Sequence, residues 1–147
     1  MRKSSYLLGL DLGTTRVKAV AIDGGGKVLE SHDSGYPLNR PTADAAEQDP
    51  EDWWRESCKV IRKTVSKSGI RAEEIEALAI AGQMHTAVFL DKNLKPLRPA
   101  ITWADNRTSA EAAEIEKRVG VERLLNVTYN RSLPGFTASK VLWLKHH

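Results

Sequence analysis

Short apolar stretches, separated by turn residues, organise the first part of the chain. Residues 6–10, 16–22 and 27–31 each have the length and the apolar content of a β-strand. Residues 11–15 and 23–26 are rich in glycine, aspartate and threonine and predict two tight reversals between them. The pattern therefore predicts an antiparallel meander of three strands. It argues against a dinucleotide-binding unit, in which a helix follows the first strand directly.

A polar segment and an amphipathic helix follow the predicted meander. Residues 32–48 contain two prolines and mixed polar residues, so we expect an extended surface loop. Residues 49–52, Asp-Pro-Glu-Asp, predict a helix start, because they supply a capping acid, an early proline and acids near the positive end of the dipole. Gly69 predicts the end of this helix. Helical spacing predicts one buried stripe, formed by Trp54, Cys58, Ile61 and Val65.

The second half of the chain predicts two more strands and two more helices. Residues 75–80 predict a buried strand and residues 87–90 a further strand. We expect one helix from Thr108 or Ser109 to about residue 118, and a last helix that Thr137 opens. Three strands, one helix, two strands and two helices indicate a single α/β domain whose sheet mixes antiparallel and parallel strands.

The composition is that of an ordinary globular domain and argues against several functions. Lys and Arg outnumber Asp and Glu by only 22 to 19 and the charges are interspersed, which argues against nucleic-acid binding. We expect no membrane span and no secretory signal. Cys58 is the single cysteine, so an internal disulfide is impossible and a reducing, cytoplasmic location is expected. Zinc is not expected, because no metal-ligand spacing relates Cys58 to His32, His85, His146 and His147.

The turn after the first predicted strand has the residues of a metal and phosphate site. Asp11 stands at the strand end, and Gly13, Thr14 and Thr15 follow it. Glycine lets the backbone approach phosphate oxygens, while amides and threonine hydroxyls donate hydrogen bonds to them. Asp11 would hold Mg²⁺ directly or through water. We call residues 11–15 the phosphate turn. It is not a P-loop, since the G-x-x-x-x-G-K-[ST] string is missing from the sequence; the alternative is a hairpin turn selected only for its geometry.

A second group of candidate residues follows the predicted strand 75–80. Gln83, Met84 and His85 stand at the strand end where α/β proteins bind ligands. Gln83 and His85 donate and accept hydrogen bonds, and Met84 offers a thioether that can pack against a ligand. This mixture suits a polyhydroxylated substrate, and we call residues 83–85 the sugar loop. The alternative is that His85 is structural or merely exposed.

A third group precedes the helix expected at Thr108. Trp103 could form an apolar wall against a sugar face, and Asp105 and Arg107 could bind hydroxyl groups or each other. The alternative is a core tryptophan beside a local ion pair at the helix entrance, and for Arg107 we favour that ion pair.

In their order along the chain, these segments resemble the FGGY family of carbohydrate kinases. The resemblance implies an actin-like, ribonuclease-H-like α/β fold in which helices flank a mixed sheet. It also implies that residues 1–147 are a partial N-terminal, sugar-binding domain without the C-terminal domain that binds the nucleotide. The strings that carry it cover nearly the whole chain: GLDLGTTRVKAV, AEQDPEDWW, LAIAGQMHTAVFLD, PAITWADNR and LPGFTASKVLWL.

Within the family, GQMH followed by PGFTASK is most similar to the xylulokinase branch. That similarity implies phosphorylation of D-xylulose to D-xylulose 5-phosphate with ATP and Mg²⁺. Asp11 matches the acid beside the magnesium ion and the transferable phosphate, and Met84 and His85 match the pair that contacts the ketopentose. The ITWADNR segment is more similar to the gluconate-kinase branch, so gluconate or another polyol stays an alternative substrate.

The resemblance also implies that catalytic parts lie outside this sequence. The general base of these kinases, an aspartate in a later glycine-rich segment, falls beyond the point that matches His147. We therefore expect the isolated chain to be inactive, and a homodimeric parent enzyme stays open. A non-catalytic sugar-binding or scaffold module is the alternative from another class. The kinase interpretation requires Asp11 and the pair Met84 and His85 to face a shared hollow.

Overall fold

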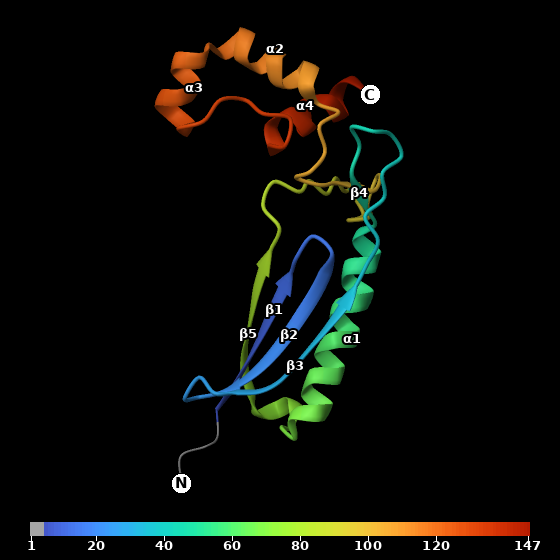
Figure 1. Ribbon diagram of the computed structural model, residues 1–147, viewed down its shortest axis with the longest axis vertical. Coiled ribbons are helices and arrows are strands. Elements are labelled where there is room, and N and C mark those ends of the chain that lie inside the picture. Colours follow the sequence, from blue (N-terminus) through green and yellow to red (C-terminus); the bar gives the residue numbers. More distant parts are fainter. Residues whose placement is uncertain (1–4) are drawn as a thin grey trace. The chain divides into compact units, whose positions relative to one another are not determined.

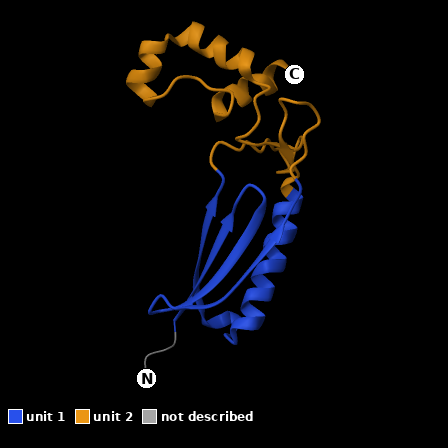
Figure 2. Ribbon diagram, viewed as in Figure 1, with its two compact units in different colours: residues 1–37, 51–83 blue, residues 38–50, 84–147 orange. Residues whose placement is uncertain are grey.

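A computed structural model describes residues 5–147 of the chain (Figure 1). The chain divides into two compact units, coloured separately in Figure 2. Unit 1 contains the residues up to Pro37 together with Glu51–Gln83, and unit 2 contains Leu38–Pro50 and Met84–His147. The chain thus passes between the units after Pro37, after Pro50 and after Gln83. Each unit has its own secondary structure and is described separately.

Unit 1 is built on a four-stranded mixed sheet with the strand order β3-β2-β1-β5. Strands β1 (Tyr6–Leu12), β2 (Arg16–Asp23) and β3 (Val28–Gly35) pair antiparallel, which confirms the predicted meander. Strand β5 (Ile75–Gly82) pairs parallel with β1. A parallel pair requires a crossover connection, and α1 lies within it. The predicted mixture of antiparallel and parallel strands is therefore confirmed.

Helix α1 (Pro50–Ser68) packs against one face of this sheet. Its first turn carries Glu51 and Asp52 as predicted, and Gly69 follows its last residue with a φ of 75°. The short 3₁₀ helix η1 (Ala72–Glu74) then leads into β5. Two groups of buried residues form the core between helix and sheet: Leu10, Val17, Ala19, Tyr36 and Val60 in one, and Leu8, Ala21 and Ile70 in the other.

The predicted stripe on α1 is correct only in its second half, where Ile61 and Val65 pack against the core. Trp54, its first member, is 70% exposed, whereas the neighbouring Trp53 packs against the core. The buried positions of the helix are Ser57, Val60 and Thr64. Two of these three are polar, so a search for apolar residues at helical spacing cannot detect the face that they form.

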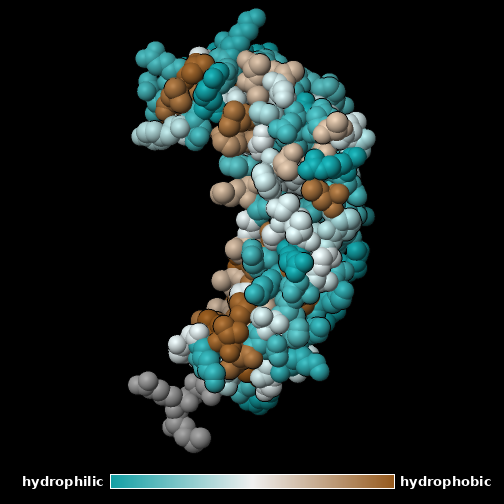
Figure 3. All heavy atoms as spheres, viewed as in Figure 1, coloured by the Kyte–Doolittle hydropathy of each residue, from teal (hydrophilic) through white to brown (hydrophobic). Residues whose placement is uncertain are grey.

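The expectation that strand 75–80 is buried is also wrong. Strand β5 stands at the edge of the sheet, and Leu78 and Ile80 are 48% and 62% exposed. Apolar side chains lie at the surface of this unit in Figure 3. Length and composition predicted a strand correctly, but they do not distinguish a central strand from an edge strand.

Unit 2 combines a small sheet with three helices. Strand β4 (Glu47–Gln48) pairs antiparallel with β6 (Ala100–Ile101). Helices α2 (Ser109–Val119) and α4 (Thr137–His146) match the predicted ones to within a residue or two, and α3 (Val121–Thr128) was not predicted.

Two predicted segments differ from the structure. Residues 32–48 are not a continuous surface loop, because β3 runs to Gly35 and Ala45, Ala46 and Gln48 are buried. Residues 87–90 form no strand; Ala87 and Leu90 make only isolated bridges, to Ile101 and Pro96. The apolar run 87–90 has the composition of a strand, but each of its pairings is limited to a single bridge.

Within residues 5–147, no helix is long and apolar enough to cross a membrane. The same part of the chain contains no group of three or more His, Cys, Asp or Glu side chains that could hold a metal ion.

A matched pair of substitutions tests the packing of unit 1. Leu10 and Ile80 are partners in the register of β1 and β5, but Leu10 is only 6% exposed. We expect Leu10→Ala to destabilise this unit by about 2–5 kcal/mol, and Ile80→Ala by less than about 1 kcal/mol. Hydrogen exchange of the β1 and β2 amides measures the stability of unit 1 separately from that of unit 2. Equal losses would show that β5 is covered in solution.

Candidate functional site

The phosphate turn joins β1 to β2 and is fixed by Tyr36 from the end of β3. The Gly13 amide donates to the Arg16 carbonyl oxygen at 3.0 Å, which closes the turn. The Tyr36 hydroxyl donates to the Gly13 carbonyl, and the Tyr36 amide donates to the Thr15 carbonyl at 3.2 Å. Burial raises the pKa of the Tyr36 phenol to about 12, and the charge of Asp11 acts in the same direction. The main chain of the turn is thus held from two sides.

Glycine at position 13 has a steric reason in this turn. A Cβ atom there would lie 3.1 Å from the Arg16 carbonyl oxygen. Because the Gly13 amide already serves the turn, phosphate oxygens would be met by the groups of Thr14 and Thr15. Thr15 is exposed and Thr14 half-buried. The hairpin geometry is observed, and phosphate binding by Gly13, Thr14 and Thr15 stays a prediction.

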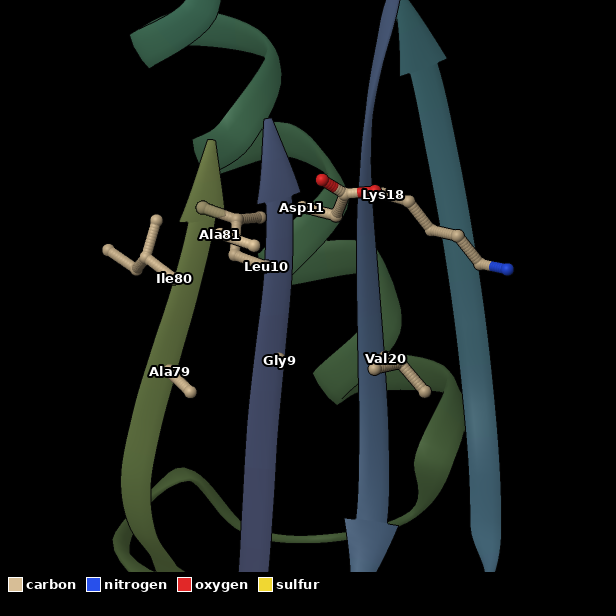
Figure 4. Close-up of a pocket in the computed structure, with 8 residues that line it drawn as sticks. All are labelled: Gly9, Leu10, Asp11, Lys18, Val20, Ala79, Ile80 and Ala81. Carbon is tan, nitrogen blue, oxygen red and sulfur yellow. The ribbon is translucent and has the colours of Figure 1, made fainter. Parts of the chain in front are cut away.

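Asp11 is exposed next to a hollow on the sheet (Figure 4). The hollow has a volume of about 310 Å³, and Asp11 and Lys18 stand opposite each other in the register of β1 and β2. Small residues of β1 and β5 keep it open; the residues that line it are Gly9, Leu10, Asp11, Lys18, Val20, Ala79, Ile80 and Ala81.

The residues around Asp11 fit a magnesium ion bound chiefly by phosphate and water. Mg²⁺ usually takes one or two carboxylates and keeps several waters. An exposed Asp11 carboxylate at a strand end supplies one such oxygen ligand. The hollow has room for further oxygen ligands, which a cage of protein side chains would exclude.

The parallel pairing of β1 with β5 brings two candidate segments to the same edge of the sheet. Asp11 pairs with Ala81 and Leu12 with Gly82, so both strands end side by side. Gln83 is the next residue after β5. Met84 and His85 already belong to unit 2, because the division between the units falls inside the sugar loop. A hollow shared by Asp11 and the pair Met84 and His85 therefore stays a prediction.

In unit 2 the side chains of Met84 and His85 are exposed, and Met84 is 76% exposed. His85 adopts a left-handed backbone conformation with a φ of 60°, which is unusual for a residue other than glycine. Its ring lies 4.5 Å from that of Phe136, measured between centroids. The buried Lys140 of α4 donates to the His85 carbonyl oxygen at 2.6 Å.

Trp103 belongs to the same group of segments. Its amide donates to Thr86 Oγ1 at 3.2 Å, and its side chain is 49% exposed, so it is not the core tryptophan of the alternative interpretation. A Cβ atom at Gly135 would come within 2.9 Å of the Trp103 carbonyl oxygen. Segments 84–86, 102–103 and 134–136 therefore converge within unit 2.

Asp105 is fully buried and is held by groups of its own unit. Its carboxylate accepts from the Ala46 amide at 2.7 Å and from the Arg107 guanidinium at 2.7–3.0 Å. Arg107 also pairs with Glu47 at 2.8 Å. The local ion pair favoured for Arg107 is thus observed, and a contact between Asp105 and sugar stays a prediction.

Two residues that position these segments were not selected from the sequence. Tyr36 falls in the segment expected to be a loop, and no motif marks it. Lys140 stands in the TASK string, which we used only for the family resemblance. Burial lowers the pKa of Lys140 to about 8, against the opposing effect of Asp105. A lysine is almost never fully buried without partners, so sequence alone does not indicate its place.

Comparison with known proteins identifies the family. A sequence model of the N-terminal domain of the FGGY family of carbohydrate kinases matches residues 6–147. The xylulose kinases of Bacillus subtilis (strain 168) and Klebsiella pneumoniae are 39% and 41% identical to this chain over 97% and 95% of its length. The chain spans only 28% of each of these relatives.

Two solved structures have the same fold over nearly the whole chain. A ligand-bound xylulose kinase from Lactobacillus acidophilus matches 96% of the chain with a TM-score of 0.86 and 31% identity. A gluconate kinase from the same organism matches 97% with a TM-score of 0.87 and 31% identity. The chain covers 28% of either structure.

Fold and sequence together define the N-terminal domain of a carbohydrate kinase. The chain belongs to the FGGY family. The predicted family and the predicted actin-like α/β fold class are both confirmed.

Removal of one hydroxyl group tests the support of the phosphate turn. We expect Tyr36→Phe to destabilise unit 1 by about 1 kcal/mol below pH 10, because the Gly13 carbonyl loses its donor. Between pH 10 and 12 the folded state keeps the Tyr36 proton that the unfolded state loses, so stability falls as the pH rises. Denaturation by urea from pH 8 to pH 11.5 should show a steeper fall for the wild type than for Tyr36→Phe. Parallel curves would contradict the role given to this phenol.

The buried carboxylate of unit 2 allows a second test. We expect Asp105→Ala to destabilise the unit by about 3–5 kcal/mol, because Arg107 and the Ala46 amide lose their partner. Arg118→Ala is the control, since it removes an ion pair with Glu114 whose arginine side chain is 70% exposed. Hydrogen exchange of the α2 amides measures the stability of unit 2, and it should change little in that control. Similar effects of both substitutions would show that Asp105 is accessible to water.

Proposed function

We propose that this chain is the sugar-binding part of an ATP-dependent kinase that phosphorylates a ketopentose, D-xylulose in first place. The observation that carries the proposal is the pairing of β1 with β5, which brings Asp11 and the start of the sugar loop to the same edge of the sheet. The identity to two xylulose kinases supports the substrate. The product would be D-xylulose 5-phosphate.

On the phosphate side, Asp11 would hold Mg²⁺ beside the terminal phosphate of ATP. When bound, the metal neutralises charge on the transferred group. Thr14 and Thr15, on a turn held by Tyr36, would orient the phosphate oxygens. A turn that is fixed before the substrate arrives provides positioning without further reorganisation, and positioning supplies most of the acceleration in this class of reaction.

On the sugar side, hydroxyl groups would be met by Gln83, His85 and the main chain of Met84. Exposed Trp103 would lie against an apolar face of the sugar. Asp105 would act mainly by fixing the segment that carries Trp103, since its carboxylate already bonds Ala46 and Arg107. The general base and the nucleotide-binding domain would come from polypeptide beyond this sequence.

Gluconate is the second candidate substrate. The similarity to a gluconate kinase of known structure and the ITWADNR segment favour it. A sugar-binding module without catalysis is a further candidate. The activity of a chimeric enzyme that contains this chain distinguishes the xylulose kinase, the gluconate kinase and the non-catalytic module.

A chimeric enzyme tests the proposed function. We would join residues 1–147 to the part of the Bacillus subtilis xylulose kinase that this chain does not match. With ATP and Mg²⁺ we expect release of ADP that depends on D-xylulose and is weaker with gluconate, ribulose and glycerol. Asp11→Asn should lower kcat at least about 100-fold. Residues 1–147 alone should show no turnover.

The same junction carrying the matching part of the Klebsiella pneumoniae enzyme is the control for folding of the chimera. If that control is active while the chimera acts on no sugar, the kinase proposal is wrong. Preference for gluconate would show that gluconate, the second candidate, is the substrate. Phosphorylation by residues 1–147 alone would show that the catalytic groups lie within this chain.

A further inference from the structure

The most unusual polar group in unit 2 is the side chain of Lys140. It is fully buried, and its Nζ atom donates to the carbonyl oxygens of His85 at 2.6 Å and of Gly135 at 2.7 Å. The two carbonyls come from segments about fifty residues apart in the sequence. Burial of an ammonium group is costly unless it is well bonded, so Lys140 can stay buried only while these two carbonyls accept its hydrogen bonds.

We propose that Lys140 is a positioning residue for the sugar loop: its buried ammonium group holds the main chain at His85 and so sets the direction of the Met84 and His85 side chains. The inference rests on the proposed function, because it concerns the same loop. Lys140 itself lies beneath the main chain of these segments and is not exposed.

The backbone of His85 shows why such support is needed. A φ of 60° is disfavoured for a residue with a Cβ atom and persists only where the surroundings determine it. The hydrogen bond from Lys140 acts on the carbonyl of that very residue. The direction of a side chain follows from the conformation of its own backbone, so release of this carbonyl would redirect the His85 ring.

The second carbonyl links the sugar loop to the remaining candidate residue. Gly135 packs against the Trp103 carbonyl, and Phe136 beside it contacts the His85 ring. The His85 and Gly135 carbonyl dipoles both have their negative oxygen ends directed at the Lys140 Nζ atom. Without a donor between them they repel each other, and the two segments would separate. One ammonium group therefore sets His85 and Trp103 in relation to each other.

The neighbouring Ser139 offers a matched control. It is 1% exposed, and its hydroxyl lies within hydrogen-bond distance of Thr108 Oγ1 and of the Leu133, Pro134 and Phe136 carbonyls. Ser139→Ala therefore weakens the same end of α4 without removing the contact to His85. If Lys140 only stabilised the fold of unit 2, Lys140→Met and Ser139→Ala would have the same effect on the sugar loop.

The test compares Lys140→Met with Ser139→Ala by NMR spectroscopy of the whole chain. In Lys140→Met we expect the His85 ring to lose the shift caused by the Phe136 ring, and the Met84 methyl and Gly135 amide signals to move. The β1 and β2 signals should stay in place. Ser139→Ala should keep the His85 ring shift. Unchanged His85 signals in Lys140→Met, or equal changes in both variants, would overturn the proposal.

A measurement on the wild type decides the case if Lys140→Met does not fold. We expect scalar couplings across the hydrogen bonds, from the Lys140 side-chain nitrogen to the carbonyl carbons of His85 and Gly135. An ammonium group that exchanges with water as fast as surface lysines, with no coupling to His85, would show that the contact is not maintained.

Titration with D-xylulose separates this inference from the proposed function. Loss of a charged hydrogen bond that orients the loop should weaken binding about tenfold in Lys140→Met and leave Ser139→Ala close to the wild type. Equal affinity of the wild type and Lys140→Met would refute the positioning role and leave the sugar site standing. If no hydroxylated sugar shifts the Met84 and His85 signals of the wild type, the loop is not a sugar site, and both proposals fail there together.

Discussion

The parallel pairing of β1 with β5 is the constraint on which the arrangement of unit 1 depends. Two parallel strands end at the same edge, so the turn after Leu12 and the loop after Gly82 begin as neighbours. The pairing needs a crossover, and α1 fills it while covering the side chains of Leu8 and Leu10. The face that α1 leaves open carries Asp11 beside the hollow of Figure 4. Packing of one face and exposure of the other thus follow from a single connection.

Buried charged side chains distinguish unit 2: Asp105, Glu111 and Lys140 are buried there, whereas the buried polar residues described in unit 1 are Ser57 and Thr64. Asp105 connects Ala46, just before β4, with Arg107, just before α2, through one carboxylate. Lys140 connects the segments at His85 and Gly135 through one ammonium group. Such groups are directional, so they fix loops that have too little apolar surface to be fixed by packing. They also make the unit sensitive to substitution, because a lost partner leaves a buried charge.

The sequence allowed correct prediction wherever a single residue type has a local physical effect. Pro50 and Gly69 bound α1, because proline and glycine act on the main chain next to them. Prediction failed where the partner is distant. The buried face of α1 contains Ser57 and Thr64, which only the neighbouring sheet makes interior. Burial of β5 was overestimated, because strand order is a property of the whole sheet.

The candidate site repeats this difference at the level of single residues. Asp11, Met84, His85 and Trp103 were selected from the sequence by the chemistry of their side chains, and all four are exposed in the structure. Tyr36 and Lys140 were missed because they act on main-chain carbonyls, and a carbonyl has no signature in the sequence. The turn that follows Asp11 is thus held by the buried Tyr36, and His85 is held through its own carbonyl by the buried Lys140.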